Sequence, residues 1–360
     1  MNDEFELSIL DSGEPTRAIA FARCGCDMAI EALPGLQLQA LFDFHRRLSD
    51  TAAGRAPKRP TAPELVQFGE QLFTLLVRGK IAAIYNRLPN SHVRLQIYSD
   101  RPDLQAIPWE YIQRPGAIPG PDAFRSVVRV IPTIGVDAPV PRRLDGSIRM
   151  LFVYAEPPRG PSVGWPRIKE SVEKQFKNQP QLRDKFVLSV VEGATSANFK
   201  EAFIGAQFDI LHIVCHGQLA ADGTASLLFQ SVKGDAGDQI SAPELANFLK
   251  DKGLALVVLS ACNTSAGDFS KEFATIAQTM VANGIPAVVA NQFEIQNSIA
   301  ASFANAFYAE LRDSGDVDLA TTKGRVSLNF GTNLPNNEAS IDWGIPTLYR
   351  HLGAAKVFQK

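Results

Sequence analysis

The amino-acid sequence predicts an α/β fold with a mainly parallel sheet and helices on both of its faces. From Ser147 onward, short apolar runs alternate with stretches of helical periodicity, which is the element order of such a sheet. The apolar runs are nearly continuous, as expected of strands buried on both faces. Gly205, Gly253 and Gly284 stand where a left-handed residue would end a helix before the next strand.

Each element of this second part can be placed by its pattern. The expected strands are Ile148–Tyr154, Phe186–Val191, Ile210–Val214, Leu254–Ser260 and Ala287–Ala290. The expected helices are Arg167–Phe176, Ser196–Gly205, Ala242–Lys252, Lys271–Asn283, Ile295–Asp313 and Asp318–Asn329. A polar, Gly- and Asp-rich insertion is expected at Ala220–Gln239.

The first part of the chain has a different pattern. Alternating residues predict a hairpin of Phe5–Leu10 and Arg17–Arg23, and helical periodicity predicts helices at Leu36–Leu48 and Ala62–Asn86. Further strands are expected at His92–Ser99 and Ser126–Ile131.

Composition excludes several classes of protein. The chain has 360 residues, 45% of them hydrophobic and 21% charged, which is typical of a globular protein rather than a disordered one. The net charge of −2 lacks the basic excess of a dedicated nucleic-acid binder. We therefore expect protein or small-molecule partners and no direct contact with nucleic acid.

The four cysteines and the N-terminal sequence indicate a cytoplasmic protein. Cys24 and Cys26 have no second Cys/His cluster that would complete a zinc site, and four cysteines are too few for a disulfide framework. The N-terminus lacks the basic and apolar regions of a signal peptide, and no apolar run is long enough to span a membrane.

Two strand ends carry the residues with catalytic potential. The run Ile210–Val214 is followed by Cys215 and His216, and the run that ends at Ser260 is followed by Ala261 and Cys262. Chemistry in open α/β sheets takes place at the carboxyl ends of strands. If these two strands are neighbours, His216 and Cys262 emerge side by side.

A thiol and an imidazole at one sheet edge are suited to acyl transfer. The imidazole of His216 can take the proton of the Cys262 thiol, and the thiolate is the nucleophile. A glycine after the histidine lets the backbone come close to a substrate. The amides of Gly217 and Cys262 could then stabilise a developing oxyanion.

The segments LHIVCHG (211–217) and LVVLSACNTSAG (256–267) resemble the His-Gly and Ser-Ala-Cys-Asn-Thr motifs of CHAT domains. These are bacterial caspase-like peptidases of the caspase and separase clan. The resemblance continues in IPWE (107–110), GIPAV (284–288) and DWGIP (342–346), so it covers most of the chain.

The resemblance implies a caspase-like fold in which residues 146–360 form the catalytic half and residues 1–145 a degenerate, non-catalytic pseudo-caspase half. It implies a cysteine endopeptidase with a Cys262–His216 dyad, without metal or organic cofactor. It also implies a protein substrate in a regulated bacterial defence or cell-death pathway, such as a pore-forming effector, and a regulatory partner that activates cleavage. The tetratricopeptide repeats often fused to such domains are absent from this sequence.

Two other functions are compatible with the pattern. A catalytically silent scaffold of the same fold would bind a peptide in the cleft, although both His216 and Cys262 are present. A thiol amidase on a small molecule is the other alternative, but the flanking glycines of a nucleophile elbow are missing around Cys262. No G-x-G-x-x-G motif follows Ile148–Tyr154, which argues against dinucleotide binding.

Several other polar and aromatic side chains have both a structural and a functional interpretation. His212 is interpreted as a core histidine in preference to a residue that orients His216, and Cys215 is expected in the core. Cys24 and Cys26 are expected on one face of a short strand. The side chains considered for holding the His216 imidazole are Asp209, Asn291 and Gln292. The aromatic residues expected to be packing anchors are Trp109 and Trp343.

The loop after the nucleophile is expected to contribute to substrate selection. Asp268 would favour a basic substrate side chain, although a helix N-cap is the preferred interpretation of this residue. Asn263 is a second substrate-binding candidate, and it carries no charge.

Overall fold

The computed structural model describes most of the chain, and masked segments separate the described parts. The described residues are 5–13, 18–52, 60–87, 93–98, 102–117, 125–131, 133, 139–143, 146–155, 170, 173, 186–231, 238–260, 269–292, 297–329 and 342–359.

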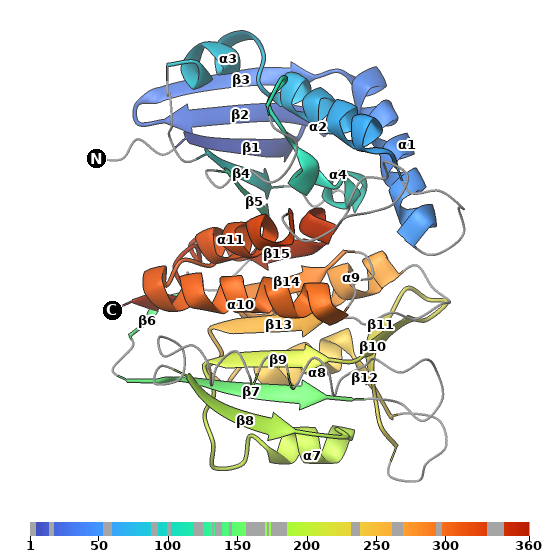
Figure 1. Ribbon diagram of the computed structural model, residues 1–360, viewed down its shortest axis with the longest axis vertical. Helices are drawn as coiled ribbons and strands as arrows, with labels where there is room; N and C mark the ends of the chain where they lie inside the picture. The colour runs from blue at the N-terminus through green and yellow to red at the C-terminus, as the bar shows by residue number, and fades with distance from the viewer. Residues whose placement is uncertain are drawn as a thin grey trace.

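An 11-stranded sheet runs through the whole molecule in the order β3-β2-β1-β4-β5-β15-β14-β13-β9-β7-β8 (Figure 1). Most neighbours are parallel, whereas β1–β2, β2–β3 and β14–β15 are antiparallel. The strands are β1 (Phe5–Asp11), β2 (Ala18–Cys24), β3 (Asp27–Leu33), β4 (Val93–Tyr98), β5 (Arg125–Val130), β7 (Ile148–Tyr154), β8 (Phe186–Val191), β9 (Ile210–Val214), β13 (Leu256–Ser260), β14 (Ala287–Asn291) and β15 (Pro346–Arg350). The expected α/β fold with a mostly parallel sheet is confirmed.

Helices cover both faces of this sheet. The helices are α1 (Gly35–Ala52), α2 (Ala62–Leu76), α3 (Gly79–Tyr85), α4 (Pro102–Ala106), α7 (Ser196–Glu201), α8 (Ala242–Leu249), α9 (Phe269–Ala282), α10 (Asn297–Ser314) and α11 (Val317–Asn329). In Figure 1, α10 and α11 lie in front of the central strands, and α8 and α9 lie behind them. Two hydrophobic clusters match this arrangement: Phe307 of α10 belongs to one, and Phe273 of α9 belongs to the other.

Three differences from the sequence prediction have local causes. The strand β3 was not expected; it extends the predicted hairpin by pairing with β2. The single helix expected at Ala62–Asn86 is two helices, because Gly79 adopts a φ of +51° and the Glu31 carboxylate accepts a hydrogen bond from the Lys80 amide. The expected polar insertion at Ala220–Gln239 contains β11 (Ala225–Phe229). This strand pairs with β10 (His216–Leu219), which directly precedes the insertion, and with β12 (Asp238–Ser241), which begins at its end, and the three form a separate sheet.

The predicted left-handed conformation of the three glycines is confirmed, although the helices before them end two to four residues earlier, at Glu201, Leu249 and Ala282. Gly205, Gly253 and Gly284 have φ values of +70°, +68° and +101°, a region that favours glycine. The helix expected at Arg167–Phe176 falls almost entirely outside the described residues. Of the described helices, none is long and apolar enough to cross a membrane.

A buried hydrogen-bond network joins the first and second parts of the chain. Arg129 of β5 is 1% exposed and donates hydrogen bonds to the Glu110 carboxylate and to the carbonyl oxygen of Ile107. Gln292, which follows β14, donates to Glu110 and to the carbonyl oxygen of Gly344. The IPWE and DWGIP segments therefore meet at this network.

A second buried ion cluster lies between α11 and the sheet. The carboxylate of Asp318 on α11 accepts hydrogen bonds from Arg94 of β4 at 2.5 Å and from Arg350 of β15 at 2.8 Å and 2.9 Å. Burial raises the pKa of Asp318, but the guanidinium groups of Arg350 and Arg94 outweigh it and hold the pKa below its ordinary value. Asp318 therefore ties the strand β4 to the C-terminal part of the fold.

Candidate active site

His216 is placed at the carboxyl edge of the central sheet. The strand β9 ends at Val214, Cys215 follows, and His216 is the first residue of β10, where it pairs with Leu228 of β11. Its side chain is 5% exposed. The chain therefore passes from the central sheet to the small β10–β11–β12 sheet at His216, the predicted catalytic histidine.

The neighbour of β9 is the strand that leads to the predicted nucleophile. The strands β9 and β13 are parallel, with Val214 opposite Ser260, and the Cys215 amide donates to the Ser260 carbonyl oxygen at 3.4 Å. The condition set by the sequence, that these strands are adjacent, is met. Cys262 follows Ser260 by two positions and lies outside the described residues, as do Asn263 and Asp268.

Gly217 has a packing role that the sequence did not indicate. A Cβ atom at this position would lie 2.8 Å from Cε2 of Phe273, closer than real contacts allow. The glycine therefore lets α9 pack directly against β10, one residue from His216. Because α9 begins at Phe269, this contact also fixes the helix that follows the 261–268 segment.

The other histidine of the first motif, His212, belongs to a buried polar cluster. Its Nε2 atom lies 2.9 Å from Ser260 Oγ, and its Nδ1 atom lies 2.9 Å from the Tyr308 hydroxyl. Its ring stacks on Phe152, with 4.2 Å between centroids. The interpretation of His212 as a satisfied core histidine is supported.

Burial lowers the pKa of His212 from 6.5 to about 3, so this imidazole is neutral in the folded protein at neutral pH. In the unfolded chain it takes up a proton as the pH falls below about 6.5. The unfolded state then binds more protons than the folded state, and acidification destabilises the fold.

We therefore expect His212 to lower the free energy of unfolding by about 3 to 5 kcal/mol between pH 7 and pH 3. Urea unfolding at intervals over this range measures the effect. His212→Gln is the reference variant, because glutamine does not titrate. Parallel pH profiles of wild type and His212→Gln between pH 6.5 and pH 4 would show that the buried imidazole makes no such contribution.

Of the three side chains proposed to hold the imidazole, Asp209 is at the wrong end of the sheet. It precedes β9, seven positions before His216 along an extended chain. Its carboxylate pairs with the Arg142 guanidinium at 2.8 Å and accepts a hydrogen bond from the Arg149 amide at 2.6 Å. Asn291 is the last residue of β14 and Gln292 follows it, so both lie at the carboxyl edge of the sheet, as His216 does. Gln292 donates its amide hydrogens to Glu110 and Gly344.

The two tryptophans pack as expected. Trp109 is fully buried and its Nε1 donates to the Leu104 carbonyl oxygen at 2.8 Å. Trp343 packs edge-on against Tyr111, with 4.7 Å between ring centroids.

The cysteine predictions are correct in one case and wrong in another. Cys215 is fully buried in the core. Cys24 and Cys26 do not share a strand face, because β2 ends at Cys24 and Gly25 turns the chain with a φ of +57°. Cys24 is buried and Cys26 is exposed.

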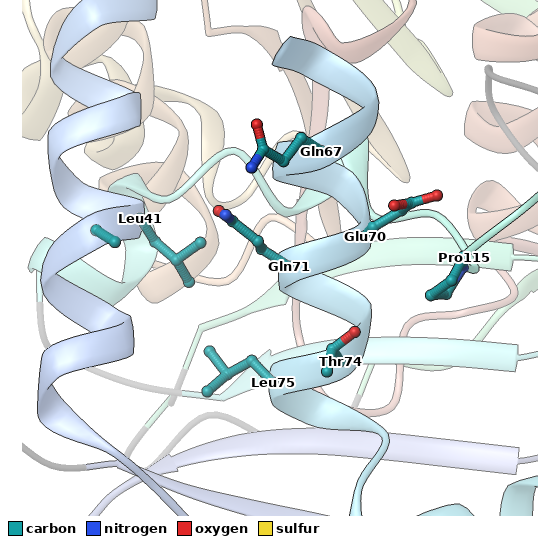
Figure 2. Close-up of a pocket in the computed structure, with 8 residues that line it drawn as sticks. Leu41, Gln67, Glu70, Gln71, Thr74, Leu75 and Pro115 are labelled. Carbon is teal, nitrogen blue, oxygen red and sulfur yellow. The ribbon is translucent and has the colours of Figure 1, made fainter. Parts of the chain in front are cut away.

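The described residues line two sizeable hollows, one at α9 and the β10–β11 turn and one on the first part of the chain. The first, of about 270 Å³, is bounded by α9 and the β10–β11 turn and reaches Arg129 and Gln292. The second, of about 490 Å³, lies between α1 and α2, where Gln71 points toward Leu41 (Figure 2). Sequence patterns gave no signal for either, because each is lined by segments far apart in the chain.

The described residues contain no group of three or more His, Cys, Asp or Glu side chains that could hold a metal ion.

The family model for the CHAT domain matches residues 66–351, which is most of the chain. This chain belongs to the CHAT-domain family. Among curated proteins, none matches it.

Solved structures of the separase–securin complex of Saccharomyces cerevisiae are similar to the chain. Two of them, at 2.6 Å and 3.0 Å resolution, match with TM-scores of 0.48 and 0.49, both at 10% sequence identity. Each match covers 97% of this chain and 30% of the matched chain. The chain thus spans less than a third of the length of those proteins.

Proposed function

We propose that this CHAT domain is a cysteine endopeptidase in which Cys262 is the nucleophile and His216 is the general acid and base. The observation that carries the proposal is the adjacency of β9 and β13, whose carboxyl ends lead into the two motif residues. In the reaction, the imidazole takes the thiol proton, the thiolate attacks the scissile carbonyl carbon, and the imidazolium protonates the leaving amine. Water then hydrolyses the thioester.

The backbone amides of Gly217 and Cys262 are proposed as the oxyanion-binding donors. Gly217 directly follows His216, and Cys262 follows the neighbouring strand β13. The dyad needs no cofactor. Asp268 and Asn263 stay predictions for substrate contacts in the segment after the nucleophile.

The domain organisation is part of this proposal. Residues 146–360 carry the catalytic residues, and residues 1–145 form a non-catalytic, pseudo-caspase-like half. The support is the division of labour along the sheet, where His216 and the strand leading to Cys262 both lie in the second part. The parallel pairing of β5 with β15 makes the two parts share one sheet.

The substrate class is a protein, and cleavage is under the control of a partner. Defence or cell death as the pathway is a prediction from the family resemblance. The alternative is a catalytically silent scaffold that binds a peptide at the same edge of the sheet.

An unbiased cleavage experiment distinguishes the peptidase from the scaffold. Purified wild type and the Cys262→Ala variant are incubated with a cell lysate, and new protein N-termini are enumerated by mass spectrometry. We expect a small set of N-termini that depends on Cys262. Identical sets from wild type and variant would contradict a peptidase that is active without an added partner, and would favour the peptide-binding scaffold.

A further inference from the structure

The strand β3 is the outermost strand of the central sheet at the end formed by the first part of the chain (Figure 1). Among the described residues it pairs with β2 alone, through seven consecutive residue pairs that no bulge interrupts. Its sequence, DMAIEAL, contains neither lysine nor proline. Lysines, prolines and bulges are the usual means by which a protein prevents a sheet edge from pairing with another chain. The edge of β3 therefore lacks these defences.

The acidic residues of β3 have partners on the face that packs against α3. The Asp27 carboxylate pairs with the Arg87 guanidinium at 3.1 Å. The Glu31 carboxylate accepts a hydrogen bond from the Lys80 amide at 2.8 Å, in the first turn of α3. Both carboxylates are thus held on the α3 side of the strand, and the residues that alternate with them carry no charge.

The opposite face of β3 is apolar and exposed. Met28, Ile30 and Ala32 alternate along it, and the first two are 67% and 63% exposed. Phe21 of β2 lies opposite Ile30, is half-buried, and extends the apolar surface away from the edge. Single exposed apolar side chains are common on protein surfaces, whereas a contiguous apolar patch is typical of an interaction site.

The same residues of β3 direct their backbone groups outward. In an antiparallel ladder, residues that exchange hydrogen bonds with the neighbouring strand alternate with residues whose N–H and C=O groups point away from it. The two-residue hairpin turn, Gly25–Cys26, makes the residue pair that flanks it a hydrogen-bonded pair. The outward-directed backbone groups of β3 therefore belong to Met28, Ile30 and Ala32, and the apolar patch coincides with the open edge.

The charges of β3 permit one register for pairing with a second copy of itself. Two copies of a strand pair antiparallel about a two-fold axis, and the residue on the axis sets the register. With Ile30 on the axis, Glu31 lies opposite Ala29 of the second copy. An axis at Ala29 would place Asp27 opposite Glu31, and an axis at Glu31 would place two copies of this carboxylate opposite each other. Like charges directly opposite are destabilising, so Ile30 is the favoured centre.

A second copy is also the occupant that closes the assembly. Pairing of β3 with the other edge strand of the sheet order, β8, would leave an unpaired edge at both ends and would continue into a filament. Pairing of β3 with β3 is self-complementary and stops at two chains. The paired stretch, Asp27–Leu33, excludes the Gly25–Cys26 turn.

We propose that this protein forms a two-fold dimer in which β3 pairs antiparallel with β3 of a second copy, with Ile30 on the axis. Met28 then lies beside Ala32 of the second copy and the two Ile30 side chains are neighbours, so the exposed apolar patch is removed from water. One continuous sheet runs through both chains. The strands β9 and β13 lie far from β3 in the sheet order, so the dimer does not depend on the peptidase function.

Sedimentation velocity of the full-length protein over a range of concentrations tests the dimer. We expect a monomer–dimer equilibrium with a Kd below about 50 µM. Ile30→Lys should raise this Kd at least about thirtyfold, because it places two like charges at the axis. Val187→Lys is the matched control, since it introduces the same charge at an apolar residue that is 53% exposed on the other edge strand, β8, and it should leave the Kd unchanged.

A protein that stays monomeric up to about 200 µM would overturn the proposal. A dimer that Ile30→Lys leaves intact, or that Val187→Lys dissociates, would overturn it as well. Unfolding curves establish that both variants are folded, and Met28→Lys, at an equally exposed position of the patch, gives a second disruption of the same edge.

Disulfide cross-linking tests the register in full-length protein that also carries Cys26→Ser and Cys262→Ala. Ile30→Cys should form a cross-linked dimer on oxidation, because Cα atoms of a hydrogen-bonded antiparallel pair lie about 5.5 Å apart. Ala32→Cys should cross-link at least about tenfold more slowly, because four residues of extended chain, about 14 Å, separate the two copies. Faster cross-linking of Ala32→Cys than of Ile30→Cys would contradict the proposed register.

Discussion

Replacing Cys262 with alanine, or His216 with alanine, is expected to lower cleavage of the natural substrate by at least about 10³-fold. The first change removes the atom that forms the thioester, and the second removes the group that accepts and returns its proton. The placement of His216 after β9, beside the strand that leads to Cys262, motivates both expectations.

The measurement is the rate of appearance of a product N-terminus under single-turnover conditions. Cys26→Ser is the matched control, because Cys26 is exposed in the turn between β2 and β3, at the far end of the sheet order from β9 and β13. It should cleave at the wild-type rate. Unfolding curves of all three variants establish that the fold is intact. A Cys262→Ala protein that retains a tenth of wild-type activity would make another residue the nucleophile.

The second large effect is on stability. Asp318→Asn is expected to lower the free energy of unfolding by about 3 to 5 kcal/mol, because it leaves Arg94 and Arg350 buried without their shared carboxylate. Since Arg94 lies in the first part of the chain, the loss should loosen the whole sheet. Chemical denaturation at pH 7 gives the value.

Glu310→Gln is a suitable control on α10, since it also removes one carboxylate and its side chain is only half-buried. It should change stability by less than about 1 kcal/mol. A companion test is expression of residues 147–360 alone, which should aggregate because β15 loses β5 as its neighbour. A soluble fragment with a cooperative unfolding transition would contradict this, and it would show that the two parts fold independently.

Much of the central sheet could be predicted because its strands are buried on both faces. The bounds of β7, β8 and β9 agree with the apolar runs, and β13 and β14 differ by one or two residues. The same runs placed His216 at a strand end. Local pattern was sufficient here because the strands carry few polar residues.

The failures occur where tertiary contacts decide the structure. The sequence of β3, DMAIEAL, contains residues that also suit a helix, and only pairing with β2 makes it a strand. The strands β10 and β12 have four residues each, too few to show a period. The hollow of about 270 Å³ is lined by residues of α4, α9 and β15, which lie far apart in the sequence, so no local spacing could indicate it.

The central claim is that His216 activates Cys262, and the rate of alkylation at pH 6 tests it without any substrate. Iodoacetamide is added to the full-length protein, and peptide mass spectrometry follows the modification of each cysteine with time. Because only the thiolate reacts, we predict that Cys262 reacts at least about tenfold faster than the exposed Cys26. In His216→Ala this difference should disappear. Equal rates at Cys262 and Cys26 in the wild-type protein would contradict the account.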